Sequence, residues 1–323
     1  MHRRLFVTAS ASVIAAPAVW AQTDNNATIR IVVPFAAGAG SDAMARFFAQ
    51  ELSKSMQRTF VVENRVGASG AIGADFVAKA APDGNTLLFI ASPFTTVAAG
   101  NPQPKYDPMD LAPVAIMGVG PLMFVAHPSV PGKNLNDVIE YAKKNPGKLN
   151  YGSAGAGGIN HLVMELLKLE TGTFMVHIPY RGIAPATIDL IGNQLQVLTG
   201  SVPALLPYIK DGRVKALAVT SRKRISVAPD VPGMEELGFK GFDVNNYWGF
   251  VAPPKTPVTI TQRLNDEVNK LLTMPAVIAR LRQDATEPSP LSLPMISAML
   301  LSDLNKWKRL IAAAKLSWTV KAV

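Results

Sequence analysis

Apolar positions in the first part of the chain switch from a short continuous run to helical spacing. Residues 29–35 form a nearly continuous run rich in β-branched side chains, which is typical of a strand buried on both faces. The apolar residues that follow share one face of a helix; they are Met44, Phe47, Phe48, Leu52 and Met56. Asp42 stands directly before them and is predicted to cap this helix.

The same alternation continues to residue 90. A strand is predicted at 60–62, a helix at 72–80 that ends at the breaker Pro82-Asp83-Gly84, and a third strand at 86–90. A strand-helix-strand-helix-strand order predicts a parallel sheet with right-handed crossovers.

A second α/β unit follows the proline-rich stretch at 101–113. Two apolar strands are expected first, near Val114 and near Met123. The later strands are predicted at 148–151, 175–178, 195–198 and 214–220, and the helices at 134–144, 161–169, 184–191 and 204–210. Asn134 is the expected cap of the first of these helices.

The chain after Pro253 has the pattern of helices alone. They are predicted at 259–272, 276–282 and 293–314. Such a tail is expected to pack back on the first unit, with chain crossings near 123–126 and 247–251. The predicted organisation is therefore lobe 1 at 22–124 plus 248–323 and lobe 2 at 125–247, joined by a hinge of two crossings.

Two glycine-rich loops follow predicted strands and precede predicted helices. They are Pro34 to Asp42 (PFAAGAGSD) and Tyr151 to His161 (YGSAGAGGINH). Each would present several backbone N–H groups at a helix N-terminus, which is a ready site for an anion. Because one loop lies in each unit, we expect the two to clamp a small anion between them.

Composition restricts the possible partners. The 323-residue chain is long enough for two lobes, and its 48% hydrophobic and 17% charged content indicates a folded protein. A net charge of +9 favours anionic partners. Nucleic acid is not expected, because the basic residues are scattered and the densest group, 222–224, has no interleaved aromatics. The absence of cysteine excludes disulfides and thiolate metal sites.

The first residues have the pattern of an export signal. Basic residues at 2–4, an apolar run at 5–19 and the small residue Ala21 predict a signal peptide at 1–21, used by the Sec route or, given the paired arginines, the Tat route. No later apolar run approaches eighteen residues, so no membrane span is expected after it. We therefore expect a periplasmic protein.

A dinucleotide-binding enzyme is the main alternative. Gly38, Gly40 and Ala43 fit the G-x-G-x-x-A pattern after a strand, and Glu63 lies where an acid would bind a ribose. Against this interpretation, Asp42 would lie close to a pyrophosphate. The alternative function is an exported NAD(P)-dependent oxidoreductase.

Other catalytic and metal patterns are weak. No G-x-S-x-G elbow occurs, so no catalytic serine is expected. His161 and Glu165 have the i, i+4 spacing of metal ligands, but no third histidine or cysteine accompanies them, so we expect no metal. His161 is instead expected to donate a hydrogen bond to a ligand or to a carbonyl.

Several polar residues lie at predicted strand ends, where open α/β sheets bind ligands. Ser41, Ser92 and Ser153 either contact a ligand or cap helices, and Arg181 either pairs with a carboxylate or remains solvated. Tyr247 and Trp248, at the second crossing, either cover a ligand or pack the hinge.

The chain resembles the periplasmic solute-binding proteins of tripartite tricarboxylate transporters, the Bug family. The resemblance runs from about Ile29 to Leu272, and its VENR-GA, AAPDG and PDVP elements are specific in combination. The matching stretches are IRIVVPFAAGAGSDAMAR, VVENRVGASGAIGADFVAKAAPDGNTLL, LNYGSAGAGGINHL, IPYRGIAPATIDLIGNQ, DGRVKALAVTSRKR, APDVPGMEELGF and WGFVAPPKTP.

This resemblance implies a type II periplasmic-binding-protein fold whose two α/β lobes close on an organic acid. It implies a receptor without catalytic activity or cofactor that delivers its ligand to membrane transporter subunits, and we expect a monomer. Carried over by position, the ligand-binding residues would be Phe35, Ala37, Gly38, Ser41, Ser92, Ser153, Ala154, Gly155 and His161. Arg181 completes the candidate set on its position after a strand.

Two departures from the family pattern concern the ligand. The family's PFPPGG reads PFAAGAG here, which changes the surroundings of loop waters. Gly200 replaces an acid that often precedes the position of Ser201, and that acid could pair with a ligand ammonium group. A plain carboxylate is therefore favoured over an amino acid.

Overall fold

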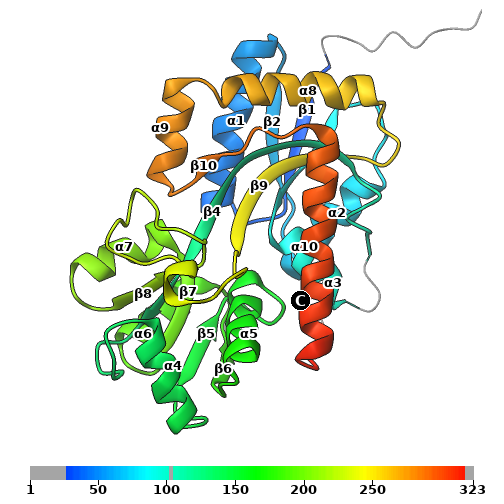
Figure 1. The fold of residues 1–323 in the computed structure, drawn as a ribbon. Coiled ribbons are helices and arrows are strands. Elements are labelled where there is room, and N and C mark those ends of the chain that lie inside the picture. Colours follow the sequence, from blue (N-terminus) through cyan, green and yellow to red (C-terminus); the bar gives the residue numbers. More distant parts are fainter. Residues whose placement is uncertain (1–26, 102–104, 317–323) are drawn as a thin grey trace, which may run out of the picture.

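The protein consists of two α/β lobes arranged one above the other (Figure 1). The computed structural model describes residues 27–101 and 105–316. The predicted signal peptide at 1–21 lies outside the described residues. Each lobe has a central sheet covered by helices on both faces, as the strand and helix alternation predicts.

The sheet of lobe 1 has the order β2-β1-β3-β9-β4. Strand β1 is parallel to both β2 and β3, whereas β9 is antiparallel to β3 and to β4. The strands are β1 (Ile29–Val33), β2 (Phe60–Asn64), β3 (Thr86–Ala91), β4 (Ala112–Ala126) and β9 (Asn245–Ala252), and the short β10 (Glu287–Pro288) pairs with the free edge of β4. The predicted parallel pairing of the first three strands is confirmed.

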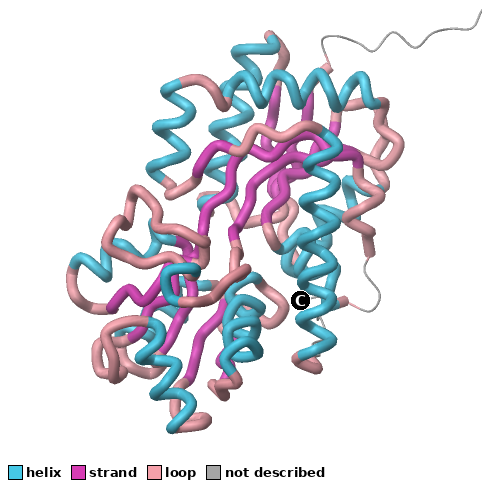
Figure 2. The backbone as a smooth tube through the Cα atoms, in the orientation of Figure 1, coloured by secondary structure: helices cyan, strands magenta, loops and turns pink. Residues whose placement is uncertain are grey.

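Strand β4 passes from one lobe into the other (Figure 2). It pairs with β9 as far as Pro121 and with the strands of lobe 2 from Leu122 onward. The prediction of two separate strands near Val114 and Met123 was therefore wrong. The first connection between the lobes lies at residues 121–122, and the second precedes β9 at Asn245. The lobe limits at 124 and 247 stay predictions.

The sheet of lobe 2 has the order β8-β4-β7-β5-β6. Strand β5 is parallel to β6 and β7, and β4 is antiparallel to both of its neighbours. The strands are β5 (Asn150–Ser153), β6 (Val176–Pro179), β7 (Val197–Ser201) and β8 (Lys215–Val219). Parallel β5, β6 and β7 bring their carboxyl ends to the same edge of the sheet.

Helices of lobe 1 cover its sheet on opposite faces because successive strand residues point to opposite sides. Ile31 and Phe89 belong to the core under α1, α8 and α9, whereas Val32 and Ile90 belong to the core under α2, α3 and α10. The helices are α1 (Gly40–Met56), α2 (Ala71–Ala78), α3 (Pro93–Gly100), α8 (Val258–Leu271), α9 (Pro275–Gln283) and α10 (Leu293–Ala313), with a 3-10 turn at η1 (Ala68–Gly70).

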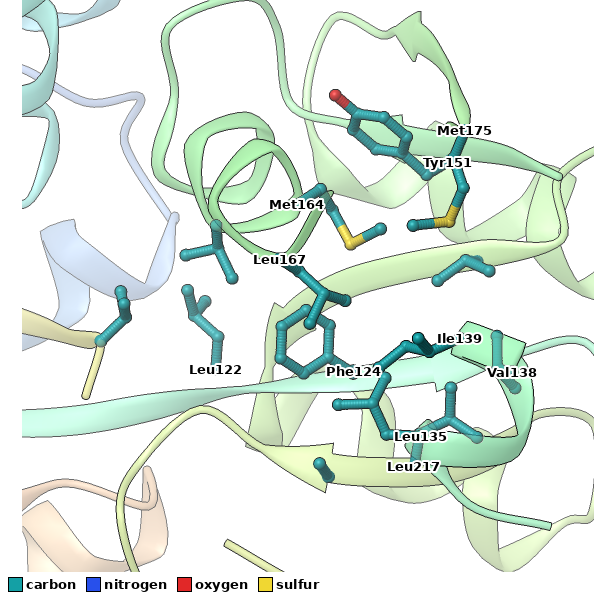
Figure 3. Close-up of a cluster of buried hydrophobic side chains, with 14 of the residues drawn as sticks. Leu122, Phe124, Leu135, Val138, Ile139, Tyr151, Met164, Leu167, Met175 and Leu217 are labelled. Atoms are coloured by element: carbon teal, nitrogen blue, oxygen red, sulfur yellow. The ribbon is translucent and has the colours of Figure 1, made fainter. Parts of the chain in front are cut away.

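Lobe 2 has the same layered core. Its helices are α4 (Leu135–Lys144), α5 (Ile159–Thr171), α6 (Ile183–Ile191) and α7 (Val202–Lys210), with a 3-10 turn at η2 (Glu235–Leu237). Figure 3 shows Phe124 of β4 and Tyr151 of β5 among side chains of α4 and α5. The predicted cap of α4 is confirmed, because the Asn134 side chain accepts a hydrogen bond from the backbone N–H of Asp137.

The last helix packs against both lobes. The first part of α10 contributes the apolar residues of its inner face to the core of lobe 1, namely Leu293, Ile296, Leu300 and Leu304. Its last turns place Trp307 and Leu310 in the core of lobe 2, beside residues of α5. The expectation that the helical tail packs on lobe 1 holds for α8 and α9, but α10 spans the two lobes.

Candidate functional site

A cavity of about 600 Å³ lies between the lobes. Lobe 1 lines it with Phe35, Gly40, Ser41 and Met44 around the start of α1, and with Arg280 and Asp284 at the end of α9. Lobe 2 lines it with Ile183, Ser201, Pro203 and Ala204, and the hinge with Pro121, Leu122, Asn246 and Trp248. The carboxyl ends of β1 and β7 thus face the same cavity.

Helices from both lobes begin at this cavity: α1 from lobe 1, and α6 and α7 from lobe 2. Helix α1 begins at Gly40 and α7 at Val202, and no side chain caps either N-terminus. Within the described residues, the backbone N–H groups of Gly40 and Ser41 have no hydrogen-bond acceptor. Unpaired N–H donors and the positive ends of these helix dipoles favour an anion here.

Asp42 shapes the first glycine loop from inside α1. Ala39 is the N-cap, so the prediction of Asp42 as the cap was wrong by three positions. The Asp42 carboxylate accepts hydrogen bonds from the Gly38 N–H (2.9 Å), the Arg46 guanidinium (2.9 Å) and the Asn64 amide (2.8 Å). The bond from Arg46 is the largest cause that lowers the Asp42 pKa to about 2, against 3.8 ordinarily. Gly38, proposed as a ligand donor, thus gives its N–H to Asp42.

The second glycine loop has a comparable internal bond. The Ser153 hydroxyl accepts from the Gly155 N–H (3.1 Å) and lies 2.7 Å from Nε2 of His177. Ser153 is fully buried, whereas Ala154 is exposed. Neither these residues nor Gly155 lines the inter-lobe cavity.

His161 lies beneath this loop and accepts a hydrogen bond. Its Nδ1 accepts from the Gly157 N–H at 3.2 Å, so the ring proton of the neutral form is on Nε2. The ring stacks on His177, with 4.1 Å between centroids. Burial lowers the pKa of His161 to about 4, and burial followed by the adjacent His161 lowers the pKa of His177 to about 4. The expected donor role of His161 remains a prediction, and its Nδ1 acts as an acceptor here.

These histidines predict a loss of stability in acid. Each folded-state pKa lies below the ordinary 6.5, so the unfolded chain binds more protons between pH 6.5 and 4. The contribution of the neutral histidines to the free energy of unfolding is therefore fully present above pH 6.5. Protonation linked to His161 alone is expected to lower the free energy of unfolding by about 3 kcal/mol as pH falls to 4. Urea unfolding across this range checks it. His161→Gln, which keeps an acceptor for the Gly157 N–H, should flatten the slope, and an unchanged slope in this variant would contradict the prediction.

Some of the remaining candidate ligand-binding residues line the cavity and others do not. Phe35 and Ser41 line the cavity, and Ala37 is exposed on the adjoining loop. Ser92 is buried and donates from its hydroxyl (2.6 Å) to the side chain of Asn246, which lines the cavity. Arg181 is exposed and is not among the described residues that line the cavity. The binding roles of these residues stay predictions.

Residues that the sequence did not single out complete the cavity. Asn246 lies at the hinge, Ser201 lies at the start of α7, and Arg280 pairs with Asp284 at 2.5 Å. The sequence left undecided whether Tyr247 and Trp248 cover a ligand or pack the hinge, and of these two Trp248 lines the cavity. Tyr247 is buried in the hinge, with its hydroxyl 3.0 Å from that of Thr95.

Residues 27–101 and 105–316 contain neither a metal-binding cluster of side chains nor a membrane-spanning helix. No group of three or more His, Asp or Glu side chains there could hold a metal ion, so His161 and Glu165 form only a pair. No helix among those residues has the length and apolar character needed to cross a membrane.

Comparisons with known proteins agree on one family. Residues 44–316 match the family model described as tripartite tricarboxylate transporter family receptor. Among curated proteins, BugT of Bordetella pertussis (strain Tohama I) is 34% identical over 297 residues, which cover 91% of each chain.

Solved structures give the same result. The periplasmic binding protein BugD is 33% identical, with a TM-score of 0.77 over 90% of this chain and 98% of its own. Rpa4515 of R. palustris, solved with adipate, is 30% identical, with a TM-score of 0.80 over 92% of this chain and 99% of its own. The predicted binding-protein fold with two lobes is thereby confirmed.

Proposed function

This chain belongs to the tripartite tricarboxylate transporter family of receptors, and from that premise we propose that it captures a small organic carboxylate in the cavity between its lobes. The observation that carries the proposal is the meeting of two uncapped helix N-termini, α1 from lobe 1 and α7 from lobe 2, at one cavity. A carboxylate would accept hydrogen bonds from both, and closure of the lobes would exclude water from them. Adipate, a dicarboxylate, is the molecule bound to the relative Rpa4515.

The other walls favour a ligand with an apolar body. Phe35, Met44, Leu122 and Trp248 also line the cavity. Arg280 is already paired with Asp284, so it offers a carboxylate less than a free guanidinium would. We therefore expect a carboxylate whose carbon skeleton packs against these side chains.

The wider role follows from the family. We propose that the chain is exported by Sec or Tat, loses residues 1–21, and acts in the periplasm as a monomer that delivers its ligand to membrane transporter subunits. It would need no cofactor and perform no catalysis. The alternative of an exported NAD(P)-dependent oxidoreductase has no support from the family, and Asp42 occupies the Gly38 N–H that a pyrophosphate would need.

A thermal-shift screen of residues 22–323 tests the proposal. Adipate, malate, citrate, benzoate, aspartate and NAD would be compared at equal concentrations. At least one plain carboxylate should raise the melting temperature in a saturable way. A shift with NAD alone would overturn the receptor role, and tight binding of aspartate would refute the preference for a plain carboxylate.

Ala204→Glu tests the anion site itself. Ala204 is exposed at the third position of α7 and lines the cavity, so a glutamate there would repel a carboxylate and reach back to the Ser201 N–H. Carboxylate affinity should fall about tenfold or more, while the unliganded melting temperature is unchanged because an acid suits a helix N-terminus. Ala204→Gln, of equal size without the charge, should bind more tightly than Ala204→Glu. Equal affinity of the two variants would exclude α7 from the site.

A further inference from the structure

The hinge wall of the cavity holds an asparagine with a fixed orientation. Asn246 lies near the start of β9, opposite Gly120 of β4, where the two strands connect the lobes. Its side chain lines the inter-lobe cavity. It therefore lines the same cavity as the first residues of α1 and α7.

Ser92 determines which way the amide faces. The Asn246 Oδ1 accepts from the Ser92 backbone N–H at 3.2 Å and from the Ser92 hydroxyl at 2.6 Å. A backbone N–H only donates, so the atom facing it must be the oxygen and the amide cannot be flipped. Ser92 is buried at 1% exposure, at the start of α3, and is held in place by the helix that follows.

The other end of the amide is an available donor. Within the described residues, Nδ2 of Asn246 makes no hydrogen bond, although it carries two N–H groups. Because Oδ1 is engaged by Ser92, these two donors are the polar groups that the side chain can offer to a molecule in the cavity. A buried donor without an acceptor is costly, so closure over a ligand favours one that supplies the acceptor.

We propose that Asn246 is a specificity-determining residue that donates to an oxygen of the bound acid at the hinge end, and that Ser92 positions it. This inference rests on the proposed function. The ligand then carries two acceptor ends, a carboxylate at α1 and α7 and a carboxylate, carbonyl or hydroxyl oxygen at Asn246. An ammonium group at the hinge end is selected against, because Nδ2 cannot accept a hydrogen bond.

Asn246→Asp is the most direct test. The aspartate keeps an oxygen for both Ser92 donors, so the fold should be preserved, but it replaces the N–H donors with a negative oxygen. Calorimetric titration with adipate and with malate should show affinity at least about tenfold weaker than wild type, at an unchanged unliganded melting temperature. Wild-type affinity in Asn246→Asp would overturn the inference.

A double-mutant cycle tests the positioning role of Ser92. Ser92→Ala removes the hydroxyl bond and should weaken adipate binding about two- to fivefold when Asn246 is present. In the Asn246→Ala background the same change should have no further effect. An equal loss in both backgrounds would overturn the positioning role, because Ser92 would then act independently of Asn246.

The two proposals fail in different ways. If neither these dicarboxylates nor the wider panel of acids binds the wild-type protein, the proposed function fails and this inference fails with it. If wild type binds and Ala204→Glu weakens binding while Asn246→Asp does not, only the role of Asn246 is refuted.

Discussion

Replacing Trp307 by alanine is expected to lower the free energy of unfolding by about 3 to 5 kcal/mol. Trp307 is fully buried near the end of α10, among the core side chains of lobe 2. Its removal leaves a large cavity and loosens the contact between the C-terminal helix and α5. Urea unfolding followed by circular dichroism measures the change without depending on tryptophan fluorescence.

Trp307→Phe is the matched control. The indole Nε1 is buried without a hydrogen-bond partner among the described residues, so phenylalanine removes an unsatisfied donor and keeps most of the apolar contact. The loss for Trp307→Phe should be less than half of that for Trp307→Ala. A loss below about 1 kcal/mol for Trp307→Ala would show that α10 is not part of the folded core of lobe 2.

Replacing Asp42 by alanine is expected to lower the free energy of unfolding by about 2 to 3 kcal/mol and to weaken carboxylate binding. The carboxylate is the common acceptor for Gly38, Arg46 and Asn64, so its loss frees the first glycine loop beside the cavity. Denaturant unfolding at pH 7 and calorimetric titration with adipate measure the two effects.

The pH dependence separates the charge of Asp42 from its shape. Because the folded pKa is about 2 against 3.8 ordinarily, the ion contributes about 2 kcal/mol above pH 3.8, and this is lost as pH falls to 2. Asp42→Asn keeps one acceptor oxygen, so it should lose less stability at pH 7 than Asp42→Ala. The free energy of unfolding of Asp42→Asn should also lack the fall of about 2 kcal/mol between pH 3.8 and 2. An unchanged slope in Asp42→Asn would contradict the assignment.

The elements that the sequence predicted well have local signals. The run at 29–35 contains β1, and the periodic apolar residues after it lie in α1. Both were predictable because burial on both faces of a strand, or on one face of a helix, produces a pattern among residues that are close in the sequence. Helix α3 was missed, since Thr95, Thr96 and Val97 have weak helix propensity and are buried through tertiary contacts.

Strand β4 shows a different limit. Gly118, Gly120 and Pro121 resemble a break between two strands, yet the chain stays extended there because β9 and then β7 pair with it. Gly118 and Gly120 also allow the segment around β10 to lie close, since a side chain at either position would meet the backbone of residues 285–287. A local residue pattern cannot report a neighbour that is so distant along the chain.

The sequence predicted the type of site, an anion site, but only some of the residues that form it. Glycine loops at strand ends indicated an anion site, and Phe35 and Ser41 do line the cavity. Asn246 and Arg280 come from the hinge and from α9, where nothing in the local sequence indicates a ligand. The sequence pattern also did not predict that Asp42 and Ser153 accept hydrogen bonds from their own loops, because each bond depends on the turn that the loop adopts.

The position of α10 offers a way to observe lobe movement directly. Because this helix contacts both cores, any rotation of one lobe against the other must shift it relative to one of them. The sequence contains no cysteine, so a thiol introduced at Ala314, which packs partly against the core of lobe 2, would be the single site for a polarity-sensitive dye. Its emission would follow opening and closing whatever acid is bound, and so would allow ligands to be screened by fluorescence alone.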